Sequence, residues 1–268
     1  MTAGMGAHDG RNFTSGKALG LSIHGLEKKY TTGKHVLSDI NIKIKPGESV
    51  SILGPSGCGK SSLLRLIAGL SRPSQGRIEW LDGERKTHPH IGLVPQEPTL
   101  MPWRTVFENV YMPLQLAGQS RNACRVEIMR TLEAVDIASV ANAYPHQLSG
   151  GMRMRVSIAR ALVCQPNALL MDEPFAALDE VTRGKLNNDL VELQTTSGIT
   201  MIFVTHSISE AVYLSSRVIV LKANPGQIHA EVPIASCGIQ GDGKRSSEIY
   251  AQECNHVSKL LKEASFAS

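Results

Sequence analysis

The stretch GPSGCGKS at residues 54–61 constrains the fold more than any other part of the chain. A short, strand-like segment at 49–53 precedes it, and an apolar segment at 62–69, suited to a buried helix, follows it. This is the phosphate-binding loop pattern G-x-x-x-x-G-K-[ST] in the strand-then-helix setting that the motif requires. Glycines let the backbone approach phosphates closely, and N–H groups at the start of the helix then face the anion. The sequence therefore predicts a nucleoside triphosphate as ligand.

Within this loop, we expect Lys60 to bridge the β- and γ-phosphates and the Ser61 hydroxyl to hold Mg²⁺. A glycine-rich turn that matches the pattern by chance is the alternative, and the character of both flanks argues against it. The residues expected to bind the nucleotide are Gly54, Pro55, Ser56, Gly57, Cys58, Gly59, Lys60, Ser61 and Ser62.

The composition fits a folded protein of the reducing cytoplasm. Apolar residues make up 42% of the 268 residues and charged residues 19%, which permits a sizeable core and argues against global disorder. The five cysteines include no CxxC pair, which speaks against a zinc site or a disulfide framework. The formal charge of +4 permits contact with an anionic membrane surface without requiring a nucleic-acid partner. We expect no membrane span, because no apolar run approaches about 20 residues.

The order of the predicted elements indicates an α/β fold with a mostly parallel sheet in its core. The first part is rich in strands, at 20–30, around Asp39, at 77–81 and at 90–94, and suggests an antiparallel β subdomain. The next part shows helical spacing of apolar residues and reads as an inserted helical subdomain. Its predicted helices cover residues 106–116, 121–134 and 148–163.

Apolar strands alternate with helices in the remainder of the core. The strands are expected at 168–171, 200–204 and 217–221, and continuous apolar runs of this kind occur where both faces of a parallel sheet are covered. Helices are predicted at 179–195, 207–214 and, beyond a short strand, 246–262. We therefore divide the chain into a flexible N-terminal tail (1–18), an ATPase domain (19–223, with the helical insertion at about 96–164) and a short C-terminal extension (224–268).

Two carboxylates, Asp172 and Glu173, come directly after the apolar run 168–171. The carboxyl end of a parallel strand is where open α/β sheets bind ligands. Asp172 suits Mg²⁺, usually through water, and Glu173 points elsewhere and can act as the general base for an attacking water. A polar strand end facing solvent is the alternative for an acidic pair.

The segment Leu148-Ser149-Gly150-Gly151-Met152 offers a second surface for an anion. Ser149 can cap the following helix, and the glycines leave backbone N–H groups bare at its positive end. A plain capped helix start explains the same residues, so this segment alone does not decide between the two.

Taken together, these motifs make the chain closely resemble the ATP-binding subunit of ABC transporters, from about Leu21 to Leu221. The resemblance equates 54–61 with Walker A, 169–173 with Walker B and 148–152 with the signature motif. It implies further roles for single residues: Tyr30 stacks on adenine, Gln96 contacts Mg²⁺ and the water, and the switch histidine His206 reaches the γ-phosphate. Its D-loop corresponds to Ala177, Leu178 and Asp179.

The resemblance also implies ATP and Mg²⁺ as cofactors and a dimer of two copies packed head to tail. Each ATP then lies between Walker A of one copy and Ser149, Gly150 and Gly151 of the other, with Glu173 as base. Further implied partners are two membrane permease subunits and, indirectly, a solute-binding protein, which would place the chain peripherally on the cytoplasmic face of the inner membrane. Met152 departs from the frequent glutamine at the end of the signature.

The run Pro98 to Val106, followed by Glu108-Asn109-Val110, resembles the importer branch that handles nitrate, sulfonates, taurine and pyrimidine precursors of thiamine. Met101 and Trp103 would form an exposed apolar patch unless another part of the protein or a partner covers them. The family implies a coupling helix of the membrane subunit as the cover, and packing of both side chains within the helical insertion is the alternative. The transported solute itself is not readable from this chain.

Two other functions compete with an import ATPase. A soluble ABC-type ATPase acting on ribosomes or DNA usually has two cassettes or long coiled coils, and dense basic patches would favour nucleic acid. This sequence shows none of these features, and we expect no nucleic-acid partner. An efflux subunit would keep the same chemistry but suits the run 102–105 less well.

Overall fold

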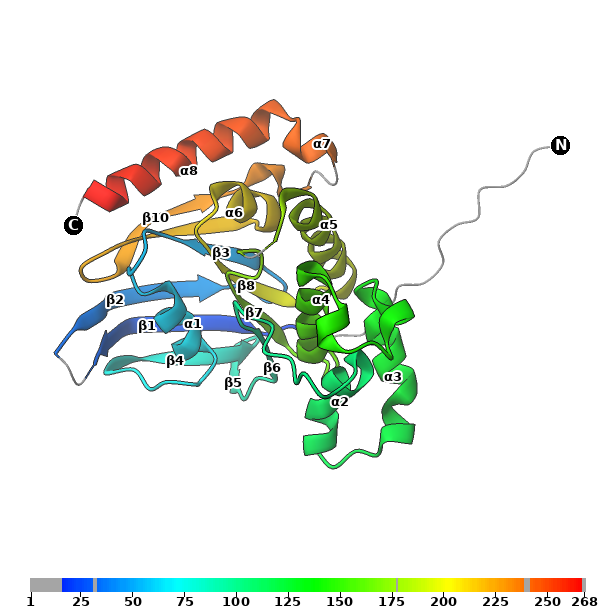
Figure 1. The fold of residues 1–268 in the computed structure, drawn as a ribbon. Helices are drawn as coiled ribbons and strands as arrows, with labels where there is room; N and C mark the ends of the chain where they lie inside the picture. The colour runs from blue at the N-terminus through cyan, green and yellow to red at the C-terminus, as the bar shows by residue number, and fades with distance from the viewer. Residues whose placement is uncertain (1–15, 31–32, 177, 239–241, 267–268) are drawn as a thin grey trace.

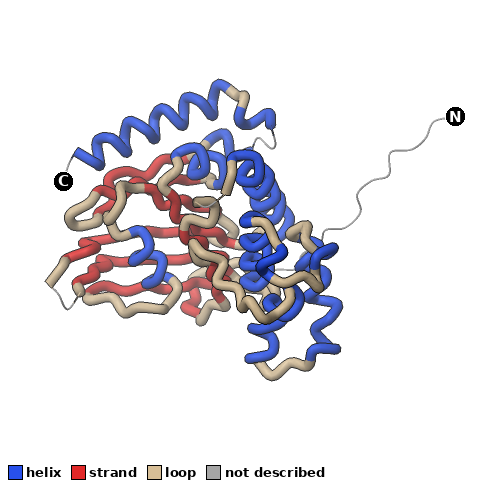
Figure 2. The backbone as a smooth tube through the Cα atoms, viewed as in Figure 1, coloured by secondary structure: helices blue, strands red, loops and turns tan. Residues whose placement is uncertain are grey.

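The computed structural model describes residues 16–30, 33–176, 178–238 and 242–266. They form two β-sheets with helices between and around them (Figures 1 and 2). The predicted fold class, a mostly parallel core with an antiparallel β part and an inserted helical part, is confirmed.

The smaller sheet is antiparallel and has the strand order β2-β1-β4-β5. Sequence patterning suggested two short strands around Asp39, but the structure has one strand there, β2. Asp39 has a φ of 49°, and its carboxylate accepts a hydrogen bond from the Asn41 amide, so the chain bends locally without leaving the sheet. The strands are β1 (Gly20–Lys29), β2 (His35–Ile44), β4 (Gln75–Asp82) and β5 (Arg85–Thr87).

The larger sheet has the order β10-β9-β3-β8-β7-β6, and all its pairs are parallel except β10 with β9. In its central strands alternate side chains enter two different cores: Leu170 faces the small sheet, while Met171 faces the outer helices. Both faces are thus covered, which explains the continuous apolar runs. The strands are β3 (Ser49–Leu53), β6 (Ile91–Val94), β7 (Ala168–Asp172), β8 (Thr200–Thr205), β9 (Arg217–Lys222) and β10 (Gln227–Pro233).

Helix α1 (Lys60–Ile67) packs between the two sheets, and the other helices lie outside this sandwich (Figure 1). α2 starts at a capping box in which Thr105 and Glu108 each bond the other's backbone N–H, so its first turn is fixed locally. None of the helices in the described ranges combines the length and apolar character needed to cross a membrane. The outer helices are α2 (Val106–Leu116), α3 (Arg121–Ala134), α4 (Gly150–Leu162), α5 (Glu180–Ser197), α6 (Ile208–Leu214), α7 (Asp242–Arg245) and α8 (Glu248–Phe266). Short 3₁₀ turns cover Ala138–Val140, Pro145–Gln147 and Ala235–Gly238.

The helix predicted at 246–262 is present as α8 (Glu248–Phe266), and the short α7 (Asp242–Arg245) precedes it. The Ser247 hydroxyl accepts the Tyr250 N–H and caps the start of α8. α8 packs on β9 and α6 through Val257 and Ala264, and it runs along the outer side of the molecule in Figure 1.

Strand register brings the ends of three strands to one edge of the large sheet. Leu53 at the end of β3 pairs with Thr205 at the end of β8, and Asp172 at the end of β7 pairs with Val204. The segments that follow these strands, which begin at Gly54, Glu173 and His206, therefore lie beside one another.

The buried centre of the large sheet gives the first prediction. Leu170→Ala removes a fully buried side chain from the core between the two sheets, so we expect a loss of about 2–5 kcal/mol in the free energy of unfolding by urea denaturation. Leu116→Ala, at an exposed position of α2, is the matched control and should change it by less than about 0.5 kcal/mol. Equal effects of the two substitutions would contradict this packing.

Candidate functional site

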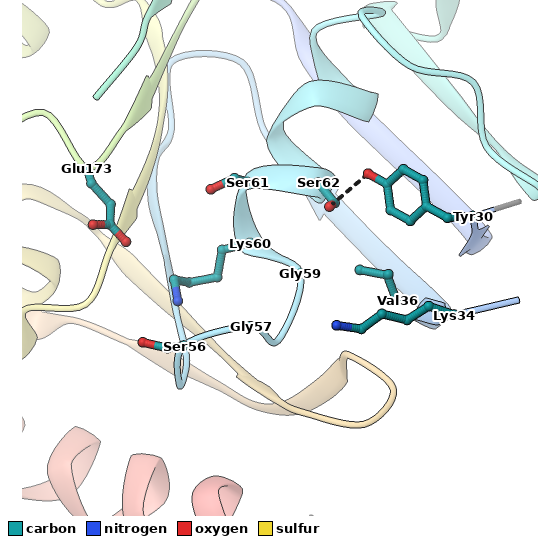
Figure 3. A pocket seen from close by; sticks show the side chains of 10 residues that line it. All are labelled: Tyr30, Lys34, Val36, Ser56, Gly57, Gly59, Lys60, Ser61, Ser62 and Glu173. Atoms are coloured by element: carbon teal, nitrogen blue, oxygen red, sulfur yellow. Dashed lines mark hydrogen bonds between the residues drawn. The ribbon is translucent and has the colours of Figure 1, made fainter. Parts of the chain in front are cut away.

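A pocket of about 380 Å³ lies between the hairpin of β1 and β2 and the loop that precedes α1 (Figure 3). Most of its lining comes from the predicted phosphate loop. Lys34 and Val36 also line it, and the sequence analysis missed them because no motif marks them; the hairpin geometry alone brings them there. The full lining is Tyr30, Lys34, Val36, Ser56, Gly57, Gly59, Lys60, Ser61, Ser62 and Glu173.

Close packing explains two of the loop glycines. A Cβ on Gly54 would lie 2.7 Å from both the Cys58 sulfur and the Leu221 carbonyl oxygen. Gly59 has a φ of 99°, and a Cβ there would meet Leu37 at 2.7 Å. The loop can therefore lie against the ends of β2 and β9 only if these residues have no side chain.

Lys60 lies inside the loop that its own backbone helps to form. Its ammonium donates to the carbonyl oxygens of Gly54, at 2.8 Å, and Pro55, at 3.1 Å. These bonds keep a nearly buried positive charge at the floor of the pocket, beside the N-terminus of α1. The floor can therefore attract polyphosphate by charge as well as by backbone N–H groups.

Ser61 and Asp172 meet at the edge of the sheet. The Ser61 hydroxyl donates to Asp172 Oδ1 at 2.9 Å. Burial raises the pKa of Asp172, and the bond from Ser61 partly opposes this shift. Gln96 follows the end of β6, the strand next to β7, and its side chain is exposed outside the pocket lining. Ser61, Asp172 and Gln96 offer the oxygen donors that Mg²⁺ prefers.

Glu173 forms one wall of the pocket, and Figure 3 shows its carboxylate on the side of Lys60 and Ser61. Its backbone has a φ of 47°, a region that non-glycine residues rarely adopt, and its N–H donates to Val204 O at 2.8 Å. Asp172 does not line the pocket, whereas the adjacent Glu173 does. Its Oε2 lies 3.1 Å from His206 Nδ1, so the structure brings the predicted base and the predicted switch histidine together.

Tyr30 closes the outer end of the pocket. Its hydroxyl lies 3.3 Å from the Ser62 hydroxyl, and the Lys28 ammonium lies 5.1 Å from the centre of its ring. Ser62 thus contacts the hydroxyl edge of the ring and Lys28 lies over one face. The Tyr30 residue nevertheless remains 42% exposed. An exposed aromatic ring in this place can stack on a nucleotide base.

Sequence comparison shows the same family as the motifs. The family profile described as "ABC transporter" matches residues 37–176. The chain belongs to the ABC transporter family. As an ABC ATPase, it binds ATP and couples ATP hydrolysis to transport.

Two curated relatives and one solved structure illustrate the similarity. The ABC ATPase is 49% identical over 230 residues to the "Uncharacterized ABC transporter ATP-binding protein MJ0412" of Methanocaldococcus jannaschii, covering 85% of this chain and 84% of that protein. It is 42% identical to "Aliphatic sulfonates import ATP-binding protein SsuB 2" of Pseudomonas syringae pv. tomato, covering 85% and 92% of the two chains. The dimeric cassette MJ0796, solved in a post-hydrolysis state with ADP and Pi, shares 34% identity and a TM-score of 0.67, covering 80% of this chain and 98% of that chain.

The predicted signature residues of the ABC ATPase lie apart from the pocket: none of Leu148 to Met152 lines it. Ser149 caps α4 by accepting the Met152 N–H at 3.2 Å, as its position predicts, and its side chain is exposed. A Cβ on Gly151 would lie 2.3 Å from Thr182 Cγ2, so glycine there lets the starts of α4 and α5 touch.

The D-loop prediction falls at the start of α5. Asp179 caps this helix, and the hydrogen bond from the Thr182 N–H lowers the pKa of Asp179. Leu178 is buried, and Ala177 lies outside the described residues.

Sequence analysis also missed a buried acid on α6. Glu210 accepts a 2.5 Å hydrogen bond from the hydroxyl of Thr205, and Arg183 Nε lies 3.6 Å from its other oxygen. Burial raises the pKa of Glu210, whereas the Thr205 bond and the Arg183 charge oppose that shift. A single glutamate in an otherwise ordinary helix gives no sequence signal of this kind, because its partners come from β8 and α5.

The cysteine of the phosphate loop gives the second prediction. Cys58 is 1% exposed, and burial raises the pKa of its thiol, so little reactive thiolate forms at pH 7.5. We expect N-ethylmaleimide to label Cys58 at least about tenfold more slowly than the exposed Cys237, as measured by peptide mass spectrometry of the native protein. Unfolding in guanidinium should make the two rates similar. Equal rates in the native protein would show that the loop is open.

Proposed function

We propose that this chain is the ATP-hydrolysing subunit of an importer for a small solute of the sulfonate type. The observation that carries the proposal is the Glu173 carboxylate, which forms a wall of the phosphate-loop pocket and lies 3.1 Å from His206. A relative of similar length is named as an import protein for aliphatic sulfonates, and this supports the direction and the class of solute.

In this proposal the nucleotide binds along the pocket, with its base on Tyr30 and its phosphates over residues 54–62. Lys60 moves its ammonium from the loop carbonyls to the β- and γ-phosphates, and Lys60 itself lines the pocket in which those phosphates would bind. The Ser61 hydroxyl and the Asp172 carboxylate are already 2.9 Å apart and fit Mg²⁺ as hard oxygen donors, with Gln96 as a third. When bound there, Mg²⁺ supplies charge stabilisation to the phosphates.

Glu173 acts as general base on the attacking water. The water proton passes to a carboxylate oxygen of Glu173 as the oxygen bonds to the γ-phosphorus and the bond to the β-phosphate oxygen breaks. His206 holds Glu173 through Nδ1, and its side chain is 63% exposed, which leaves it accessible to a γ-phosphate. The backbone N–H groups of the loop and the Lys60 ammonium stabilise the developing charge.

A second copy of the chain completes each site. The segment Leu148 to Met152 presents a capped, glycine-rich helix start away from the pocket of its own chain, which suits contact with the γ-phosphate held by a partner. Gly151 packs closely against Thr182, three residues after Asp179, and this supports a position of the D-loop near the same surface. The dimeric MJ0796 cassette supports this arrangement by similarity.

The loop at 98–105 provides the docking surface for the membrane permease subunits. Trp103 is 72% exposed, so the alternative in which its side chain packs within the helical insertion does not describe this structure. The loop is nevertheless held firmly: the buried Asn109 amide bonds Met101 and Arg104, and Arg160 donates to the Pro98 and Thr99 carbonyl oxygens.

A hollow of about 480 Å³ lies beside Trp103, lined also by Arg104, Gln115 and Arg121. An exposed aromatic ring next to a hollow, on a loop held by partly buried and exposed polar bonds, suits insertion of a short helix from the permease. The cassette would then lie peripherally on the cytoplasmic face of the membrane, with a solute-binding protein acting on the permease from the other side. We retain the division into a tail (1–18), an ATPase domain (19–223) and an extension (224–268) as part of this proposal.

The base assignment gives the third prediction. Glu173→Gln removes the proton acceptor but keeps the size of the side chain, so we expect ATP turnover to fall by about 10²-fold or more while ATP binding persists. Steady-state phosphate release and nucleotide titration measure the two effects, and size-exclusion chromatography with ATP should show a stabilised dimer. Glu133→Gln, at an exposed acid of α3 outside the pocket, serves as the control and should keep turnover. Normal turnover of Glu173→Gln would remove Glu173 as base.

The docking surface gives the fourth prediction. Trp103→Ala should lower solute uptake by the assembled transporter at least about tenfold, because a central aromatic anchor is lost. ATP turnover by the isolated cassette should stay within about twofold, since Trp103 does not touch the pocket. Val126→Ala removes another exposed side chain of the helical part and is the control. Loss of folding in Trp103→Ala, seen as a lower midpoint of urea denaturation, would instead favour a packing role.

A further inference from the structure

Helix α6 starts two residues after His206, and the C-terminal segment holds it by two hydrogen bonds. The Tyr250 hydroxyl of α8 donates to the Ser209 carbonyl oxygen, at 3.0 Å, in the first turn of α6. The Lys244 ammonium of α7 donates to the Tyr213 carbonyl oxygen, at 2.7 Å, near the end of α6. Both ends of this short helix are therefore tied to residues beyond position 240.

The contacts around these bonds are close and partly buried. Lys244 is 2% exposed, and its ammonium also lies 5.2 Å from the centre of the Tyr213 ring. The Arg245 guanidinium lies 4.7 Å from the same ring, and the Tyr250 ring meets the Tyr213 ring edge-on, with centroids 6.4 Å apart. Burial of a lysine charge is costly unless it is well bonded, so the position of Lys244 relative to α6 is narrowly defined. Burial also raises the pKa of Tyr250, which keeps its hydroxyl protonated as a donor.

The start of α6 is bonded to Thr205, the last residue of β8, which directly precedes His206. Glu210 bonds the Thr205 hydroxyl, which in turn accepts the Ser207 N–H at 3.0 Å, so the bonded residues flank His206 on both sides. A shift of α6 would therefore move the backbone of His206 and change its 3.1 Å contact with Glu173. None of the residues that line the pocket belongs to α6.

We propose that Tyr250 and Lys244 are positioning residues for His206, so that the C-terminal segment sets the catalytic rate of the ATPase through α6. This inference rests on the proposed role of His206. It assigns the segment a function in turnover, whereas nucleotide binding stays with the phosphate loop and Tyr30. Small displacements of groups that position a reaction lower the rate much more than they lower substrate binding.

Tyr250→Phe in the full-length chain tests the proposal. It removes the bond to Ser209 and keeps the ring on Tyr213, and water can satisfy the Ser209 carbonyl because this bond is exposed. We expect kcat to fall about threefold to tenfold with KM for ATP unchanged. Tyr111→Phe is the matched control, since its hydroxyl also donates to a carbonyl, that of Gln119 at 2.7 Å, but far along the chain from α6. The control should keep wild-type kcat, and both variants should keep a wild-type urea midpoint.

A second measurement reports the position of His206 directly. The imidazole NMR signal of His206, assigned by its loss in His206→Ala, should shift in Tyr250→Phe and stay in place in Tyr111→Phe. Lys244→Met, which removes the second bond, should lower kcat in the same way and again spare KM. Wild-type kcat in Tyr250→Phe and Lys244→Met, with His206→Ala inactive, would overturn the positioning role alone. Normal turnover of His206→Ala would instead overturn the proposed role of His206, and equal losses in kcat and ATP affinity would indicate general damage rather than positioning.

Discussion

The parallel pairing of β3, β7 and β8 is the constraint on which the rest of the site depends. Because Leu53 pairs with Thr205 and Asp172 with Val204, the segments after all three strands emerge at one edge of the sheet. A slip of one residue in either pairing would turn alternate side chains to the wrong core and separate Ser61 from Asp172. The apolar layers on both faces hold this register, so the energy that orders the polar site comes from burial of its non-polar surroundings.

The site itself is held by bonds between segments that the sequence separates widely. Ser61 bonds Asp172 across 111 positions, and His206 meets Glu173 across 33. Asp172 ends β7, and Glu173 and His206 directly follow β7 and β8, whereas Ser61 lies in the first turn of α1. Glu173 adds an unusual backbone conformation, and of the two adjacent acids it is the one that lines the pocket. Two adjacent acids can therefore serve different purposes.

Much of this arrangement was predictable from sequence, and the reasons are local. The phosphate loop, the apolar strands and the helix at 106–116 each carry their own pattern, and the last even has a capping box at Thr105. β5 was missed because Arg85–Thr87 is short, exposed and without alternation. Lys34, Val36 and Glu210 were missed because their places depend on residues distant in sequence, which no spacing rule reveals. The four-residue α7 was missed because its residues, Asp242–Arg245, include no apolar side chain.

Helix α4 connects two surfaces that lie far apart in the sequence, the signature segment at 148–152 and the loop at 98–105. Its first turn is capped by Ser149, and Arg160 near its last turn donates to the backbone at Pro98 and Thr99, next to the exposed Trp103. The helix has 13 residues and so spans about 20 Å, and from Met152 onward it contains neither glycine nor proline. Such a helix is stiff along its axis, since every turn is hydrogen-bonded to the next. A displacement of the Ser149 end would therefore move the loop at 98–105 together with the helix as one rigid body, and no part of the chain would need to refold.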